Sequence, residues 1–207
     1  MKNRQDKEQI AEKAIKELVS QGNLKKLSQE DARVLAMFYD TKSFNRLQTA
    51  KAIHKLSQER TLKPQLGVTM EYTDNSEVVS ASYYAMYYIV HAYLAGCYRT
   101  KLTEGLRGVH AITHKIILYY LVKTKKLAKH LYDEYVKTLE VASTLQNLSP
   151  DSFMDDAYKY AEQYDNVRTA REVFTYNTNP KVEAPHAERA IKTAEEFIAT
   201  IRQLIQR

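Results

Sequence analysis

The stretch SASYYAMYYIVHAYLA, residues 80–95, places five tyrosines in sixteen positions and contains no Lys, Arg, Asp or Glu. On a helix, Tyr84, Tyr87, Tyr88 and His91 share one face, and apolar side chains cover the others. A helix that is apolar on all sides has to be enclosed by neighbouring helices. Each buried tyrosine then needs a hydrogen-bond partner for its hydroxyl. The stretch therefore predicts a central bundle helix with an internal polar network.

The same segment raises the alternative of a membrane span. Residues 78–98 form 21 positions without a fixed charge, which is long enough to cross a bilayer. However, tyrosines, two serines and His91 are spread through the segment, whereas spanning helices fill their centre with Leu, Ile, Val and Phe. We therefore expect a helix buried in a bundle and no membrane association.

The composition is that of a globular protein. Hydrophobic residues make up 44% and charged residues 27% of the 207 residues, with only five glycines and four prolines. So few chain breakers favour long helices. Cys97 is the only cysteine, which excludes an internal disulfide, and we expect its thiol to be buried and inert. The charged N-terminus is unlike a secretory signal, so we expect a cytoplasmic protein.

Helical periodicity extends along nearly the whole chain. Pro64 and Gly67 interrupt it within residues 61–75, where we expect an ordered loop rather than a short strand. Ser149 and Pro150 are a typical helix start, and that helix continues or kinks beyond its expected end at residue 164. The pattern predicts helices over residues 5–20, 28–38, 42–59, 76–97, 104–122, 125–146, 150–164 and 185–204.

Strand candidates are nearly absent, so the predicted fold class is all-α, an up-and-down helical bundle. No Gly/Ser-rich linker divides the chain. We place one boundary near residue 40, with a two-helix N-terminal extension over residues 1–40 and the main bundle over residues 41–207.

Several segments resemble those of HEPN-domain proteins, a superfamily of helical nucleotide-binding proteins. SASYYAMYY at residues 80–88 is similar to the family's S-R-A-Y-Y-A-M-F-H helix, and RLQTAK at 46–51 to its R-L-x-x-A-K helix. THKII at 113–117 resembles the T-H-x-G-V stretch. Residues 168–176 and the helix at 187–204 resemble the R-x-x-A-D-Y turn and the closing A-x-x-F-I helix. The resemblance covers about residues 42–207 and implies the HEPN type of bundle.

The resemblance also implies partners and an activity. Many HEPN proteins are dimeric, metal-independent ribonuclease toxins whose active site combines an Arg with a His four to six residues later. In this chain Ala81 and Tyr88 stand where the family often has Arg and His. Arg168 and Arg171 occupy the region of the catalytic arginine, but no His follows within that window. The resemblance implies a homodimer and a nucleotidyltransferase-type antitoxin as partner.

An earlier Arg–His combination is the candidate catalytic site. Arg107, His110 and His114 are spaced i, i+3 and i+7, so a continuous helix places them on one face. There Arg107 would bind a phosphate, and a histidine would move the proton of a ribose 2′-hydroxyl. The alternative is that all three are structural. The His110/His114 spacing also suits zinc, but the motif lacks the glutamate of zinc proteases, and we expect neither metal nor cofactor.

A basic stretch follows, and we interpret it as a phosphate-binding candidate or, alternatively, a solvated helix end. The helix after residue 150 is acidic by contrast, which suits self-association or docking of a basic partner. The predicted nucleic-acid-binding residues are Lys123, Lys125, Lys126, Lys129, Arg168 and Arg171.

Two functions remain open from the sequence. The first is a HEPN-like protein that binds RNA or nucleotides, as a toxin–antitoxin or defence component with metal-independent ribonuclease activity. The second is a non-catalytic module for protein–protein interaction. The net charge of +6 permits phosphate contact without establishing it.

Overall fold

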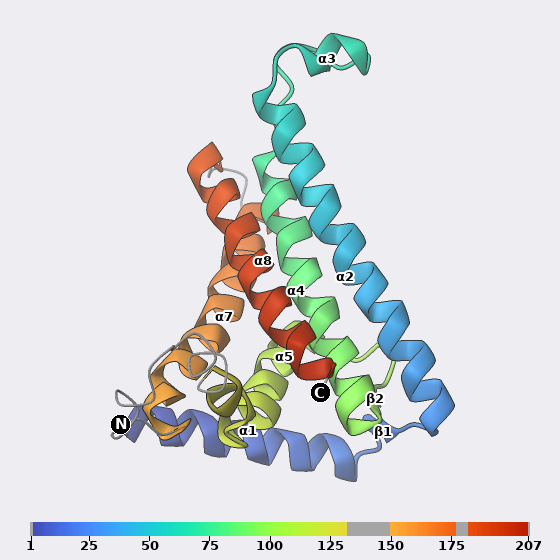
Figure 1. The fold of residues 1–207 in the computed structure, drawn as a ribbon, viewed down its shortest axis with the longest axis vertical. Helices are drawn as coiled ribbons and strands as arrows, with labels where there is room; N and C mark the ends of the chain where they lie inside the picture. The colour runs from blue at the N-terminus through green and yellow to red at the C-terminus, as the bar shows by residue number, and fades with distance from the viewer. Residues whose placement is uncertain (1, 132–149, 177–181, 207) are drawn as a thin grey trace, which may run out of the picture. The chain divides into compact units, whose positions relative to one another are not determined.

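The computed structural model describes residues 2–131, 150–176 and 182–206, and these are mostly helical (Figure 1). The prediction of an all-α protein is confirmed. The chain divides into two compact units. Unit 1 comprises Met1–Leu27 and Thr100–Gln163, and unit 2 comprises Ser28–Arg99 and Tyr164–Arg207. This division differs from the predicted boundary at residue 40, which lies inside a helix of unit 2.

Unit 2 begins with the long helix α2 (Gln29–Gln58). The Oγ of Ser28 caps it by accepting a 3.0 Å hydrogen bond from the amide of Asp31. The two helices predicted over 28–38 and 42–59 are in fact this single helix. No glycine or proline occurs between Ser28 and Pro64, so nothing in the chain interrupts the helical hydrogen bonds near residue 40.

The tyrosine-rich segment forms α4 (Asn75–Tyr98), and its expected burial is confirmed. Fourteen of its 24 residues are buried, and Tyr83, Met86 and Tyr93 are among the largest enclosed side chains. The carboxylate of Asp74 caps the helix by accepting a 2.9 Å hydrogen bond from the amide of Glu77. Among the described residues, no helix is long and apolar enough to cross a membrane.

Helix α2 runs antiparallel to α4, and small side chains let the two backbones approach closely. The Oγ of Ser43 donates a 2.8 Å hydrogen bond to the carbonyl of Ala85, and Ser57 Oγ accepts one of 3.1 Å from the amide of Asp74. Between the helices lie α3 (Leu62–Gln65) and the expected ordered loop. The buried ammonium of Lys63 holds this loop by donating a 2.9 Å hydrogen bond to the carbonyl of Met70.

Two further helices complete unit 2. Helix α8 (Ala184–Ile205) lies along α4 and confirms the predicted closing helix. Helix α7 (Met154–Tyr176) continues unbroken past its expected end at residue 164, because no glycine or proline interrupts it, and its residues from Tyr164 onward belong to unit 2. The exposed thiol of Cys97, 3.7 Å from the carbonyl oxygen of Leu204, corrects the expectation of a buried cysteine.

Unit 1 contains α1 (Lys2–Ser20) and a two-stranded antiparallel sheet of β1 (Leu24–Lys26) and β2 (Thr100–Leu102), which pairs Leu24 with Leu102. The buried side of α1 carries Ala11, Ile15 and Leu18, whereas Ile10 is 59% exposed.

The remaining helices of unit 1 start later than expected. Helix α5 (Val109–Ile117) begins five residues beyond the predicted start at residue 104, because Gly105 and Gly108 adopt left-handed conformations with φ of 73° and 69°. It continues as the π-helix η1 (Leu118–Lys123). Residues 126–131 are helical, and the rest of the predicted 125–146 helix lies outside the described residues. The 3₁₀ turn η3 (Pro150–Phe153) precedes α7, whose residues up to Gln163 belong to this unit.

Candidate nucleic-acid interface

A row of aromatic rings lies along one side of α4, as the sequence spacing predicts. The ring centre of Tyr87 is 5.3 Å from that of Tyr88, 6.3 Å from that of Tyr84 and 4.3 Å from that of His91. His91 is buried, whereas the three tyrosines are half-buried. The row therefore combines an enclosed imidazole with rings that solvent reaches.

Helix α2 extends this row with two more rings. Tyr39 stacks on Tyr88 with a centroid distance of 6.0 Å and an interplanar angle of 19°. It also lies 5.5 Å from the ring of His91. Phe38 meets the edge of Tyr39 at 5.4 Å and is 48% exposed, although it is a large apolar side chain. The aromatic surface is thus continuous from α4 onto the outer side of α2.

Two cations of α2 lie over these rings. The ammonium of Lys42 is 4.7 Å from the ring centre of Phe38 and 5.2 Å from that of Tyr88. The guanidinium of Arg46 is 5.7 Å from the ring centre of Tyr84. Such distances are within the range in which ring quadrupoles attract cations.

A third cation reaches the rings from α7. Arg171 donates a 2.9 Å hydrogen bond from Nη2 to the hydroxyl of Tyr84. We call the whole surface the aromatic–cationic face, and it comprises Phe38, Tyr39, Lys42, Arg46, Tyr84, Tyr87, Tyr88, His91 and Arg171.

The charges that α2 brings to this face are only weakly compensated. Within the described part of the chain, Lys42 makes no ion pair, and Arg46 reaches the carboxylate of Glu77 only at 3.9 Å. Asp40, the acidic residue next to Tyr39, is instead held by Arg202 through hydrogen bonds of 2.9 and 2.7 Å. The face therefore has cations available for an anionic ligand.

Burial affects the hydroxyls of two tyrosines of α4. It raises the pKa of the buried Tyr83 and of the half-buried Tyr87 well above the ordinary value of 10.0. The hydroxyl of Tyr83 lies 3.0 Å from that of Tyr164 on α7. With the bond from Arg171 to Tyr84, this contact belongs to the internal polar network that the sequence predicts.

The predicted catalytic residues all lie in unit 1. Arg107 is exposed and sits in the turn before α5, so the prediction that it shares a helix face with the two histidines is wrong. The left-handed Gly108 separates it from the helix. His110 and His114 are half-buried on α5, one turn apart. The described residues include no group of three or more potential ligands that would hold a metal ion.

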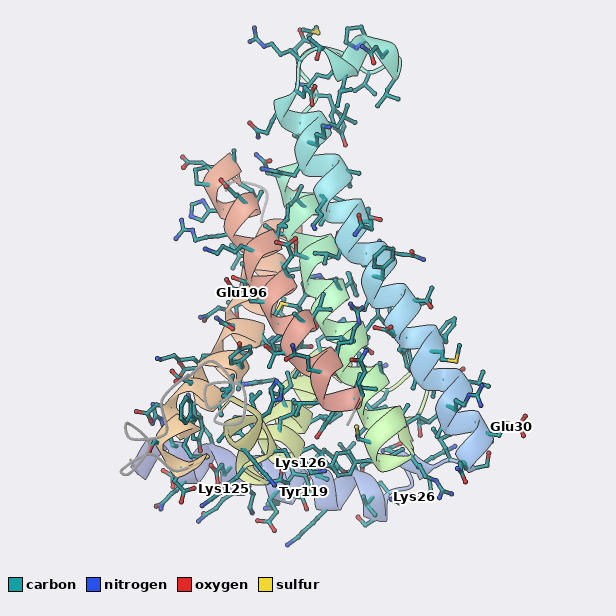
Figure 2. The ribbon with its side chains drawn as sticks, in the orientation of Figure 1. Lys26, Glu30, Tyr119, Lys125, Lys126 and Glu196 are labelled. Atoms are coloured by element: carbon teal, nitrogen blue, oxygen red, sulfur yellow. The ribbon has the colours of Figure 1, made fainter. Side chains whose placement is uncertain are left out.

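The predicted phosphate-binding lysines also belong to unit 1. Lys123 pairs with Glu12, and this hydrogen bond, followed by that of Lys16, holds the pKa of the Glu12 carboxyl below its ordinary value. Lys125 lies 2.6 Å from a carboxylate oxygen of Asp151. Figure 2 marks Lys125 and Lys126 just after η1. Lys126 and Lys129 are exposed.

Arg168 and Arg171 belong to unit 2, whereas the predicted phosphate-binding lysines belong to unit 1. Arg168 is bound on its own helix by Asp165 at 2.8 Å and by Glu172 at 2.7 Å, which leaves it little charge to offer a ligand. Of the predicted nucleic-acid-binding residues, only Arg171 belongs to the aromatic–cationic face.

The contribution of α2 to this face was not foreseen. Phe38, Lys42 and Arg46 are spaced four residues apart, which places them along one side of a helix. This four-residue spacing is visible in the sequence. It spans residues 39–41, however, where the sequence analysis expects a break between two helices.

No family model, curated protein or solved structure matches the chain. The geometry of unit 2 is therefore the basis for a functional proposal.

Proposed function

We propose that the protein is a HEPN-like helical protein that binds RNA or nucleotides through the aromatic–cationic face of unit 2. The observation that carries the proposal is the position of Lys42, over an exposed phenylalanine and a half-buried tyrosine and without an ion pair among the described residues. Single-stranded nucleic acids are bound by aromatic rings that stack on bases and by cations that contact phosphates. Both kinds of group are adjacent here.

The family assignment is part of the proposal. It is supported by the segments at 46–51, 80–88 and 187–204, which all fall on helices of unit 2. Residues 168–176, which resemble a turn of the family, are instead part of the helix α7. The similar stretch at 113–117 belongs to unit 1. With this assignment we propose a cytoplasmic component of a toxin–antitoxin or defence pair, acting as a homodimer with a nucleotidyltransferase-type antitoxin as partner.

Binding is tested by fluorescence anisotropy with a labelled single-stranded RNA at several salt concentrations. We expect Tyr88→Ala to weaken binding about 10-fold, since stacking contributes roughly 1–3 kcal/mol per base. Lys42→Ala should also reduce the slope of log affinity against log salt by about 0.7, the value for one phosphate contact on a single strand. Tyr88→Phe, which keeps the ring, should retain binding.

Lys55→Ala is the matched control, because Lys55 is an exposed lysine of α2 outside the aromatic–cationic face. Its affinity and salt slope should stay close to those of the unchanged protein. Equal affinities for the unchanged protein, Lys42→Ala and Tyr88→Ala would refute this face as the binding surface.

Ribonuclease activity is a separate part of the proposal. A cleavage assay without divalent metal, comparing the unchanged protein with Arg107→Ala and His114→Ala, tests the predicted catalytic residues. Loss of cleavage in both variants would assign the chemistry to unit 1. Cleavage that persists in both would remove these residues from the mechanism, whereas salt-sensitive binding without any cleavage would indicate a phosphate-binding protein without catalysis.

A second candidate function, a protein–protein interaction module, is favoured by a different observation. Four large apolar side chains on one side of α2 are between 48% and 63% exposed. Exposed apolar side chains gathered in this way are typical of interaction sites. The four residues are Val34, Met37, Phe38 and Phe44. An absence of RNA binding at low salt would favour this alternative.

A further inference from the structure

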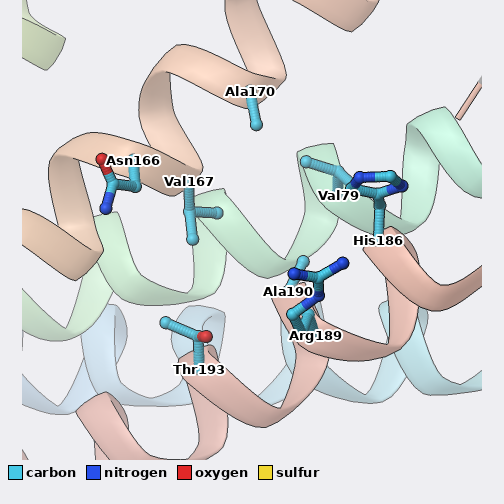
Figure 3. A pocket seen from close by; sticks show the side chains of 8 residues that line it. All are labelled: Val79, Asn166, Val167, Ala170, His186, Arg189, Ala190 and Thr193. Atoms are coloured by element: carbon cyan, nitrogen blue, oxygen red, sulfur yellow. The ribbon is translucent and has the colours of Figure 1, made fainter.

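A pocket of about 210 Å³ lies within unit 2, between α7 and α8 and against α4. Figure 3 shows Val167 and Ala170 of α7 facing side chains of α8, with Val79 of α4 beside them. None of the residues that line it belongs to the aromatic–cationic face. We call it the α7–α8 pocket.

The inner part of this pocket is apolar. Val79, Val167 and Ala190 are buried in the fold, and Ala170 is half-buried. Two alanines where the helices face each other leave space that larger side chains would fill. The volume corresponds to about seven water molecules, which is enough for a six-membered ring with a small substituent. An apolar body of that size suits the pocket better than water does.

The rim of the pocket is polar and cationic. His186 and Arg189 are exposed residues of α8, and Figure 3 shows the Arg189 guanidinium directed toward the pocket. Among the described residues, Arg189 forms no ion pair. Asn166 and Thr193 add an amide and a hydroxyl. A guanidinium presents a planar set of donors that matches a carboxylate or phosphate.

The lining contains no carboxylate and no cysteine. It therefore offers neither an acidic partner for Arg189 nor an obvious nucleophile beyond the hydroxyl of Thr193. The lining residues therefore suit ligand binding better than catalysis.

We propose that the α7–α8 pocket binds a small organic anion, with the carboxylate or phosphate on Arg189 and a ring or branched hydrocarbon in the apolar part. This site goes beyond the proposed RNA binding and does not depend on it. An aromatic carboxylate and an aryl phosphate both carry an anionic group on a ring, and this shared chemistry defines the ligand class.

The test uses the full chain with isotope-labelled methyl groups, titrated with benzoate, phenyl phosphate or benzyl alcohol at constant ionic strength. We expect benzoate and phenyl phosphate to shift the methyl signals of Val79, Val167, Ala170 and Ala190. The affinity should be millimolar, as expected for about ten heavy atoms. Benzyl alcohol, which has the ring without the charge, should bind about 10-fold more weakly.

Variants separate the two parts of the pocket. Arg189→Gln should lower the benzoate affinity about 10-fold, and Arg189→Lys should restore part of it, because the charge returns without the planar fork. Ala170→Leu should abolish binding by filling the apolar part. Lys192→Gln, a change at an exposed cation on the same helix that does not line the pocket, should have no effect.

Three outcomes would overturn the proposal: no methyl shifts with either anion, equal affinity for benzyl alcohol and benzoate, or unchanged binding in Arg189→Gln. The last variant alters an exposed side chain, so the test does not rely on Ala170→Leu folding correctly. RNA binding, measured in parallel, should be the same in Arg189→Gln as in the unchanged protein. Failure of either function is thereby distinguished from failure of the other.

Discussion

The guanidinium of Arg171 donates a 2.9 Å hydrogen bond to the hydroxyl of Tyr84, and its central carbon lies 5.3 Å from the centre of that ring. The two residues are 87 positions apart and join α7 to α4. One side chain thereby supports the bundle and also brings positive charge to the aromatic–cationic face.

This bond should contribute measurably to stability. We expect Tyr84→Phe to lower the free energy of unfolding by about 1 kcal/mol, because the guanidinium loses a neutral acceptor. A double-mutant cycle with Arg171→Gln, followed by denaturant unfolding, should give a coupling energy of at least about 0.5 kcal/mol. Strict additivity of the two changes would contradict the contact.

Alkaline pH should destabilise the fold through the buried Tyr83 and the half-buried Tyr87. Burial raises the pKa of Tyr83 and Tyr87 above the ordinary value of 10.0, so the native state keeps these hydroxyls protonated while the unfolded state ionises. The stabilisation is complete below pH 10 and is lost as the pH rises toward the folded-state values. The free energy of unfolding should fall by about 1.4 kcal/mol per pH unit for each such tyrosine.

Denaturant unfolding at a series of alkaline pH values checks this dependence. Tyr87→Phe should reduce the slope, because one fewer hydroxyl ionises on unfolding. An unchanged slope in that variant would show that Tyr87 titrates in the folded protein as it does in the unfolded chain.

Gly96 on α4 should accept a methyl group. A Cβ at this position would lie 3.5 Å from the Cβ of Ala36 and 3.6 Å from Cγ2 of Ile205, which is ordinary van der Waals contact. We expect Gly96→Ala to raise the free energy of unfolding by about 0.5–1 kcal/mol, because alanine is the better helix former. Thermal and denaturant unfolding both measure this change.

Gly105→Ala is the contrasting variant. Gly105 has a φ of 73°, so a side chain there is strained although no atom lies within 4 Å of its Cβ position. It should destabilise the protein by roughly 1 kcal/mol. Stabilisation by both changes would show that packing space, and not backbone conformation, decides the result.

The cap of α4 gives a further prediction. Asp74 accepts a 2.9 Å hydrogen bond from the amide of Glu77. Asp74→Ala should lower the free energy of unfolding by about 1 kcal/mol, and Asp74→Asn should lower it much less, because asparagine is also a good cap. If both variants lose the same stability, the negative charge of Asp74 matters more than the capping bond.

The sequence predicts the helices of this protein better than their ends. Two helices were identified well because their apolar residues are the ones that become buried. These are α4, with its apolar segment from Val78 onward, and α8, whose apolar residues recur with helical spacing. The sequence analysis missed the continuity of α2 near Asp40. The apolar pattern is weak there, although no glycine or proline interrupts the chain. The late start of α5 depends on the left-handed backbone of Gly105 and Gly108, which residue spacing alone does not reveal.

The candidate site was predictable only in part. The row of rings on α4 follows from helical spacing, because its members lie within one helix. Its partners do not: Tyr39 and Lys42 come from α2, and Arg171 comes from α7, so their meeting depends on tertiary packing. Arg168 is a different case, because its partners Asp165 and Glu172 lie three and four residues away on the same helix, a spacing that the sequence does show.

Neither unit is a continuous piece of chain, because the chain passes between units 1 and 2 after Leu27, Arg99 and Gln163. No single truncation from either terminus can excise one unit intact. To produce unit 2 by itself, a designer would have to delete the first 27 residues of the chain and join Arg99 to Tyr164 with an artificial linker. Fragment libraries and limited trimming will therefore tend to yield partial cores, and isolated pieces that fail to express carry no information about either unit.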